Sequence, residues 1–176
     1  MDNKYEKGYV HVYTGNGKGK TTAAFGLALR ALMAGKKVFI GQFVKSMKYN
    51  ETKLENIVDG LKIKQYGRGC FIYGDPEQAD VDMAVEGLKD CERVLKSDEY
   101  DMVILDEITI ALYYNLLKTE DVVRVVKERN PKIEVVLTGR MAPPEIIEIG
   151  DVVTEMKEIK HYYNTIGLES REGIER

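Results

Sequence analysis

Tryptophan is absent from this chain, and cysteine, histidine and proline are rare. Its 176 residues include two cysteines, two histidines and four prolines. Cys70 and Cys91 lack the Cys-x-x-Cys spacing of zinc and redox motifs, and two cysteines are too few for a disulfide framework. We therefore expect no zinc site, and we expect both thiols to be small buried hydrophobic groups in a reducing compartment.

Long apolar runs and an excess of positive charge are also missing. No segment approaches the roughly 18 apolar residues of a membrane span, and the first ten residues lack the apolar core of a signal peptide. The formal net charge of −3 gives no basic footprint for nucleic acid. We expect a soluble, cytoplasmic protein with no membrane or nucleic-acid partner, in which any anion binding is local.

Short apolar segments alternate instead with helix-forming segments along the whole chain. Two of them, from Val38 and in YDMVILDE (residues 100–107), are almost continuously apolar, which is typical of strands buried on both faces of a parallel sheet. Strands that alternate with helices of this length predict an α/β fold with a mainly parallel sheet covered on both faces. The length favours one domain over residues 1–176.

The boundaries of these elements follow from apolar periodicity and from glycine and proline positions. The expected strands are residues 9–13, 36–44, 61–67, 100–107, 132–139 and 151–156, with 61–67 nearer a sheet edge. The expected helices are residues 20–34, 79–96 and 108–117, one capped by Thr119, and a short one that begins at Pro143 or Pro144.

The segment TGNGKGKTT (residues 14–22) lies between the first expected strand and the first expected helix. The P-loop pattern is Gly-x-x-x-x-Gly-Lys-[Ser/Thr] in this context. Gly19, Lys20 and Thr21 supply its end, but Thr14 stands where the first glycine belongs and Gly15 comes one residue later. We interpret the segment as a P-loop variant and not as an ordinary glycine-rich turn.

Each residue type in this loop suits a bound phosphate chain. Glycines at 15, 17 and 19 allow backbone conformations closed to other residues, so that N–H groups converge on phosphate oxygens. Lys20 can reach a phosphate, and the Thr21 hydroxyl can bind Mg²⁺. Lys18 adds a second charge, or is simply a solvated loop lysine. The positive end of the following helix supports the same anion.

Two carboxylates, Asp106 and Glu107, end the apolar strand. In P-loop proteins such a carboxylate lies beside the phosphates and helps to hold Mg²⁺. Asp106 could instead cap the next helix. The two interpretations are compatible, because only one carboxylate needs to face the metal.

The loop alone does not decide the reaction. Glu107 could orient a water molecule, and Arg68, Arg140 or Arg171 could supply positive charge, so a small-molecule kinase or an ATPase is open. A non-catalytic nucleotide-binding module is a third hypothesis. A RecA-like DNA motor is disfavoured, because no basic stripe with aromatic residues is visible.

A series of blocks along nearly the whole chain narrows this choice. They are TGNGKGKTTAAFGLALRA (14–31), GQFVK (41–45), DMVILDEI (101–108), LTGR (137–140), KHYYNTIG (160–167) and the closing GIE (173–175). In this order they resemble the ATP:corrinoid adenosyltransferases of the CobA/CobO/BtuR family. The loop with the displaced first glycine is characteristic, whereas the other blocks are informative as a series.

The resemblance implies a RecA-like three-layer P-loop fold and a homodimer. It implies transfer of the 5′-deoxyadenosyl group of ATP to Co(I) of a corrinoid, with release of triphosphate. ATP, Mg²⁺ (or Mn²⁺) and the corrinoid substrate would then bind, and a flavoprotein would supply electrons. The nucleotide would lie reversed in the loop, because the bond to break is C5′–O and not O–P.

The resemblance also implies roles for individual residues. Lys20 and Glu107 would act in catalysis, and Thr21, Asp106 and Glu107 would hold the metal. His161 would lie near the nucleotide or corrinoid, unless it is a surface histidine. The residues expected to hold the nucleotide are Gly15, Asn16, Gly17, Lys18, Gly19, Lys20, Thr21 and Thr22.

One departure concerns bulky aromatic residues that, in the family, displace the lower axial ligand of the corrinoid. The corresponding positions hold Cys70 and Ile72, and Phe71 and Tyr73 lie one residue out of phase. Either the loop shifts and Phe71 or Tyr73 acts as the wedge, or this protein handles the ligand differently. A hydrophobic loop that only packs on its neighbour would show the same residues.

Overall fold

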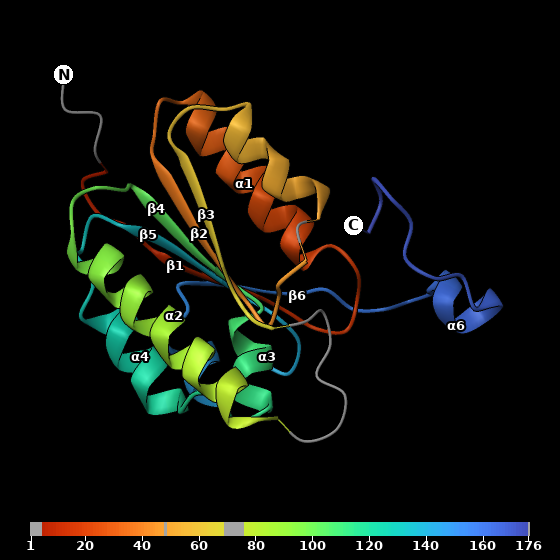
Figure 1. The fold of residues 1–176 in the computed structure, drawn as a ribbon. Coiled ribbons are helices and arrows are strands. Elements are labelled where there is room, and N and C mark those ends of the chain that lie inside the picture. Colours follow the sequence, from red (N-terminus) through yellow and green to blue (C-terminus); the bar gives the residue numbers. More distant parts are fainter. Residues whose placement is uncertain (1–4, 48, 69–75, 176) are drawn as a thin grey trace.

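A six-stranded sheet organises the described part of the chain (Figure 1). The computed structural model describes residues 5–47, 49–68 and 76–175. The strand order is β3-β2-β4-β5-β1-β6, and every neighbouring pair is parallel. The prediction of a mainly parallel sheet is therefore confirmed. The strands are β1 (Val10–Thr14), β2 (Val38–Phe43), β3 (Leu61–Tyr66), β4 (Met102–Asp106), β5 (Glu134–Thr138) and β6 (Val152–Glu155).

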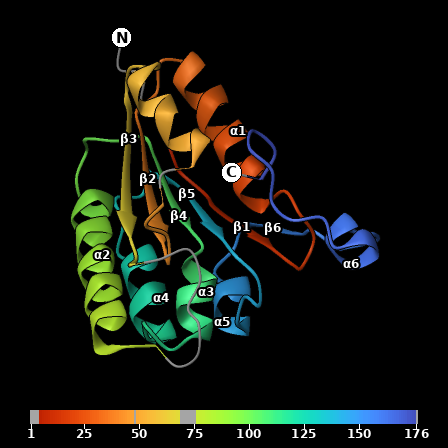
Figure 2. The same ribbon diagram turned by 45° about the vertical axis from the view of Figure 1, so that its right-hand side comes forward.

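Helices cover both faces of this sheet and complete the three layers (Figures 1 and 2). One core cluster joins α1 (Lys20–Met33) to the sheet, with the 3₁₀ helix η1 (Asn50–Asn56) beside it. The other cluster joins the opposite face to α2 (Gln78–Lys96), α3 (Ile108–Tyr113), α4 (Thr119–Lys127) and α5 (Pro144–Glu148). Within the described part of the chain, no helix has the length and apolarity to cross a membrane.

Burial along the strands follows their place in the sheet. All residues of the central strands β2 and β4 are buried, as their continuous apolar runs predict. The edge strand β3 alternates in part and exposes Lys62 between buried Leu61 and Ile63, which confirms the predicted edge position. The opposite edge, β6, is exposed at all four residues.

Several local details differ from the sequence-based expectations. The helix expected over 108–117 ends at Tyr113, because Asn115 turns into the left-handed region with φ 55°. Thr119 is the first residue of α4 and does not cap it, since the extended residue before the helix is Lys118. A further helix, α6 (Tyr162–Ile166), was not expected. It stands out from the body of the molecule and buries no residue.

Candidate functional site

The loop of residues 14–22 connects β1 to α1 at the carboxyl end of the parallel strands. Gly19 precedes α1 with φ 117°, a left-handed conformation that favours glycine. Gly17 lies so close to the segment after β6 that an added Cβ would be 2.6 Å from the Met156 carbonyl oxygen. The glycines are therefore required by the path of the loop against this segment.

Lys20 lies under the loop with only 6% of its surface exposed. Its Nζ donates to the carbonyl oxygens of Gly15 (2.7 Å) and Gly17 (2.8 Å), so the ammonium is held inside the turn. Burial, and after it the charge of Arg140, lowers the pKa of Lys20 from its ordinary value. The N–H of Gly17, which we expected to face phosphate, donates here to the Met156 carbonyl at 2.6 Å.

Asp106, at the end of β4, is the most enclosed charged group of the site, with no exposed surface. Its Oδ1 accepts hydrogen bonds from Thr21 Oγ1 (2.8 Å) and Thr138 Oγ1 (2.7 Å). Its Oδ2 accepts from Lys45 Nζ (2.9 Å) and Gln42 Nε2 (3.1 Å). Burial alone would raise the pKa of Asp106, but the Lys45 charge and these hydrogen bonds outweigh it and lower the pKa.

Glu107 follows in a left-handed conformation with φ 58° and is the residue that precedes α3. The alternative that Asp106 caps this helix is therefore wrong. The backbone N–H of Glu107 donates to Thr138 Oγ1 at 3.0 Å, which fixes the turn. Burial, followed by the charge of Asp106, raises the pKa of the Glu107 carboxyl. Its neighbour is thus held as an anion, while Glu107 more readily takes up a proton.

The oxygen donors of this cluster suit a hard divalent cation. A carboxylate offers about four lone-pair sites, and Asp106 uses its oxygens on four donors. The Thr21 hydroxyl gives its proton to Asp106, so its own lone pairs remain for a ligand. Residues 5–47, 49–68 and 76–175 contain no group of three or more His, Cys, Asp or Glu arranged to hold a metal. The Thr21 hydroxyl, and the carboxylate of Glu107 next to Asp106 in the chain, are the predicted oxygen ligands left for such an ion, whose other positions would be taken by phosphate oxygens and water.

The remaining predicted residues are distributed around the loop and the C-terminal segment. Asn16, Lys18 and Thr22 are exposed on the loop. Lys18 Nζ donates to the Ile174 carbonyl at 3.1 Å and lies 4.0 Å from the Glu175 carboxylate. The C-terminal segment thus returns to the predicted phosphate loop.

Of the predicted residues His161, Phe71 and Tyr73, the structure describes only His161. His161 precedes α6, and its Nδ1 accepts from the Tyr163 N–H at 3.1 Å. The adjacent Tyr162 hydroxyl bonds to Glu175, which connects α6 to the segment beside Lys18. Phe71 and Tyr73 lie outside the described residues.

Sequence reasoning missed three partners of Asp106, namely Gln42, Lys45 and Thr138. Two signals pointed to them. Gln42 and Thr138 are polar residues inside buried strands, where each needs a partner. Lys45 closes the GQFVK block, which carried the resemblance without an assigned role.

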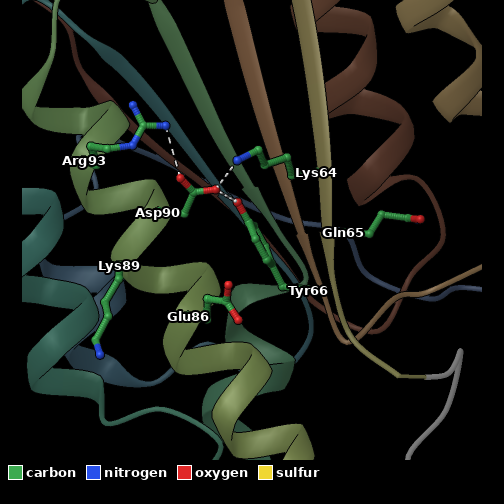
Figure 3. A pocket seen from close by; sticks show the side chains of 7 residues that line it. All are labelled: Lys64, Gln65, Tyr66, Glu86, Lys89, Asp90 and Arg93. Carbon is green, nitrogen blue, oxygen red and sulfur yellow. Dashed lines mark hydrogen bonds and ion pairs between the residues drawn. The ribbon is translucent and has the colours of Figure 1, made fainter.

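A separate hollow of about 500 Å³ lies between the edge strand β3 and α2 (Figure 3). Asp90 lies among Lys64 (2.6 Å), the Tyr66 hydroxyl (2.7 Å) and Arg93 (3.1 Å), and these contacts lower its pKa to about 2 against the opposing effect of burial. Lys89 points away from this cluster. None of the lining residues belongs to the loop of residues 14–22, so this hollow is not the predicted nucleotide site.

A parallel α/β sheet, a glycine-rich loop closed by Lys20, and a buried aspartate bonded to the loop threonine together define a P-loop nucleotide-binding protein. Comparison with known families identifies the family within this class. The chain belongs to the family of ATP:corrinoid adenosyltransferases BtuR/CobO/CobP, which matches residues 6–176.

Individual relatives agree with this assignment. The chain is 38% identical to a corrinoid adenosyltransferase of Sinorhizobium sp, covering 97% of this chain and 81% of the relative. It is 36% identical to a corrinoid adenosyltransferase of Escherichia coli strain K12, covering 97% and 86%. It is 34% identical to corrinoid adenosyltransferase CobA of Salmonella typhimurium strain LT2, again covering 97% and 86%.

Proposed function

We propose that this chain, as a single domain, transfers the 5′-deoxyadenosyl group of ATP to the Co(I) centre of a corrinoid and releases triphosphate. The observation that carries the proposal is the family match over residues 6–176, and the hydrogen bond that joins Thr21 of the loop to the buried Asp106 supports it. The family match does not favour the kinase or ATPase hypothesis.

The reaction needs placement more than proton transfer. The Co(I) electron pair attacks C5′, the C5′–O bond breaks, and its electron pair leaves with the triphosphate while cobalt becomes Co(III). Because Co(I) is already a strong nucleophile, the protein's task is to hold C5′ in line with cobalt at about 3–3.5 Å. We propose that residues 14–22 grip the triphosphate in the reversed orientation that the family implies, so that the ribose carbon faces the corrinoid.

Negative charge builds on the triphosphate as the bond breaks, and fixed positive groups stabilise it. We assign this role to Lys20, with Lys18 as a second cation, and the nucleotide contacts to Gly15, Asn16, Gly17, Gly19 and Thr22. Thr21 and Glu107 would hold Mg²⁺, or Mn²⁺ in its place, which supplies further charge neutralisation when bound. Asp106 supports this ion by orienting the Thr21 hydroxyl, since its own oxygens are engaged.

Mixing the protein with MgATP and chemically reduced cobalamin tests the function. We expect a light-sensitive Co–C absorption spectrum and one triphosphate for each adenosyl group transferred. Release of ADP and phosphate without the Co–C species would instead support an ATPase. Binding of ATP with no turnover under either condition would support a non-catalytic module.

We also propose a homodimer, which the family resemblance implies. Exposed apolar side chains at the sheet edge support it: Val152 and Val153, which point to opposite faces of the edge strand β6, are 44% and 43% exposed. Ile159 and Ile166 in the following segment are 86% and 75% exposed. Sedimentation equilibrium should give twice the chain mass, and Val153→Glu should shift the protein to monomer. A monomeric wild type at micromolar concentration would reject the dimer.

Two further assignments follow from the chemistry and the family. Cobalt must be reduced to Co(I) before attack, and we propose a cytoplasmic flavoprotein as the electron donor. We propose that Phe71 or Tyr73 displaces the lower axial ligand, and that His161 contacts the nucleotide or corrinoid. Phe71→Ala and Tyr73→Ala should each be compared for transfer from Co(II) with a weak reductant and from preformed Co(I). A wedge residue would affect only the first reaction.

A further inference from the structure

The chain turns sharply after β2, at Val44. This residue has φ 57°, a left-handed conformation that is a genuine outlier for a β-branched side chain. Such strain persists only where the surrounding structure enforces it, and it is concentrated at functional sites. The strain at Val44 is therefore explained by the residue that the turn brings into position.

Neighbouring residues hold this turn in place. The Val44 N–H donates to the Tyr66 carbonyl at 3.0 Å. Gly67 lets the two backbones meet, because an added Cβ there would lie 2.5 Å from the Lys45 nitrogen. Gln65 bridges Gln42 Oε1 (3.1 Å) and the Met47 carbonyl (2.9 Å), which ties both sides of the turn to β3.

The turn delivers Lys45 to the buried carboxylate of Asp106. The Lys45 side chain is 13% exposed, and its Nζ lies 2.9 Å from Oδ2 of Asp106 and 3.9 Å from Glu51 in η1. An ion pair of this kind is weak evidence for stability, because the cost of desolvating both charges offsets their attraction. A strained turn that only formed this pair would thus bring little benefit to the fold.

The effect of Lys45 that we consider important concerns Oδ1, the other oxygen of the Asp106 carboxylate. Lys45 and Gln42 occupy Oδ2, which leaves Oδ1 for Thr21 and Thr138. A hydroxyl has one proton and two lone pairs. With its proton committed to Asp106, the Thr21 hydroxyl keeps its lone pairs for another ligand.

We propose that Lys45 is a positioning residue of the metal–nucleotide site, which acts through Asp106 to fix the Thr21 hydroxyl for a divalent cation. The inference rests on the proposed function for its ligand, MgATP. Groups that orient metal ligands in this way typically change metal affinity about 10- to 100-fold when they are removed.

The test compares ATP binding by the full chain with Mg²⁺ and with a chelator, by isothermal titration calorimetry. We expect Lys45→Met to lower the affinity for MgATP about 10- to 100-fold and to leave the affinity for metal-free ATP at the wild-type value. Lys45→Arg, which keeps the charge, should recover most of the loss. The matched control is Lys62→Met, which removes a half-exposed lysine of β3 that pairs with Glu55 of η1.

A second readout is independent of calorimetry. Electron paramagnetic resonance of Mn²⁺ titrated into protein and ATP should show fewer bound ions for Lys45→Met than for the wild type at equal concentrations. In the double variant Lys45→Met/Asp106→Asn, the loss should not exceed that of Asp106→Asn alone, because Lys45 acts through that carboxylate. This comparison also covers the case in which Lys45→Met leaves a buried charge that prevents folding.

Two results would overturn the inference. One is a folded Lys45→Met protein with wild-type metal dependence, and the other is an equal loss of affinity with and without metal, which would indicate a structural role. None of these measurements uses a corrinoid. A wild type that binds MgATP but transfers nothing to Co(I) would therefore remove the proposed function and leave the role of Lys45 intact.

Discussion

Lys20 has two kinds of contact to lose, because its ammonium holds the carbonyl groups of Gly15 and Gly17 and is our candidate phosphate contact. We expect Lys20→Ala to lower the rate of adenosyl transfer by at least about 100-fold, as for other removed donors that stabilise a developing anion. The exposed Lys18, changed to Ala, is the comparison and should lose less. Assays of triphosphate release at quenched time points measure the rates of both variants. Equal losses would mean that burial of Lys20 under the loop has no special importance.

Asp90 carries an acid-sensitive contribution to stability. Its pKa in the folded protein is about 2, below the ordinary value of 3.8, because hydrogen bonds from Lys64, Tyr66 and Arg93 outweigh burial. A group with a lowered pKa stabilises the fold above its unfolded pKa, and this contribution is lost as pH falls through the folded value. The loss therefore falls between about pH 4 and pH 2.

Replacing this carboxylate tests the assignment. Asp90→Asn should lower stability at pH 7 and flatten the dependence of the unfolding free energy on pH between 4 and 2. Urea unfolding at a series of pH values measures this slope, with the exposed Asp82→Asn on the same helix as the control. An unchanged slope in Asp90→Asn would show that the cluster in Figure 3 does not contribute to acid stability.

At the scale of elements, α1 and α2 each contain a glycine, and the two have opposite surroundings. Gly87 in α2 faces Tyr66, and an added Cβ would lie 2.5 Å from the ring. Gly26 in α1 is exposed, with nothing within 4 Å of an added Cβ. Helix propensity favours alanine over glycine by about 1 kcal/mol at both positions, but overpacking at a buried site costs about 1–3 kcal/mol.

The two glycines therefore predict changes of opposite sign. Gly26→Ala should raise the unfolding free energy by up to about 1 kcal/mol, and Gly87→Ala should lower it. Chemical denaturation of both variants gives the comparison within one protein. If Gly87→Ala were as stabilising as Gly26→Ala, the packing of α2 on β3 would be looser than the Tyr66 contact indicates.

The elements that could be predicted from the sequence are those with a clear local pattern of apolar residues or glycines. The run Met102–Asp106 predicted a buried strand because every residue but the last is apolar, and the loop glycines placed the start of α1. The strained turn at Val44 was invisible, because local preference disfavours that conformation for valine. The helix α6 was also missed, since its five residues bury no face and so show no apolar period.

The site residues also fall into two groups, those predicted from a local motif and those whose contacts depend on the tertiary fold. Thr21 and Asp106 were predicted from motif position, and the structure joins them at 2.8 Å. Lys45 lies 61 residues from Asp106, and their pairing depends on β2 and β4 being neighbours in the sheet. Strand order is set by tertiary packing, so a single sequence without an alignment does not specify that contact.

At the scale of the whole molecule, the C-terminal segment contributes few buried contacts. No residue of 157–175 is buried, although Lys18 contacts Ile174 and Glu175. In the Val153→Glu variant, where the proposed dimer contacts are already lost, deleting residues 159–176 should therefore shift the melting temperature by no more than about 2–4 °C, which corresponds to about 1 kcal/mol for a chain of this size. Adenosyl transfer should fall sharply, because the deletion removes His161, which we propose as a nucleotide or corrinoid contact. Calorimetry and the transfer assay separate the two effects, and a large drop in melting temperature would contradict the prediction.

The Asp106 cluster has a consequence for how the protein acquires activity after synthesis. Its four donors come from Thr21, Gln42, Lys45 and Thr138, which lie 32 to 85 residues away along the chain. Contacts of such long sequence separation require the chain to close large loops before they form, which slows folding. ATP binding should thus emerge only at the end of refolding, and a time course followed by nucleotide capture should lag behind one followed by helix content.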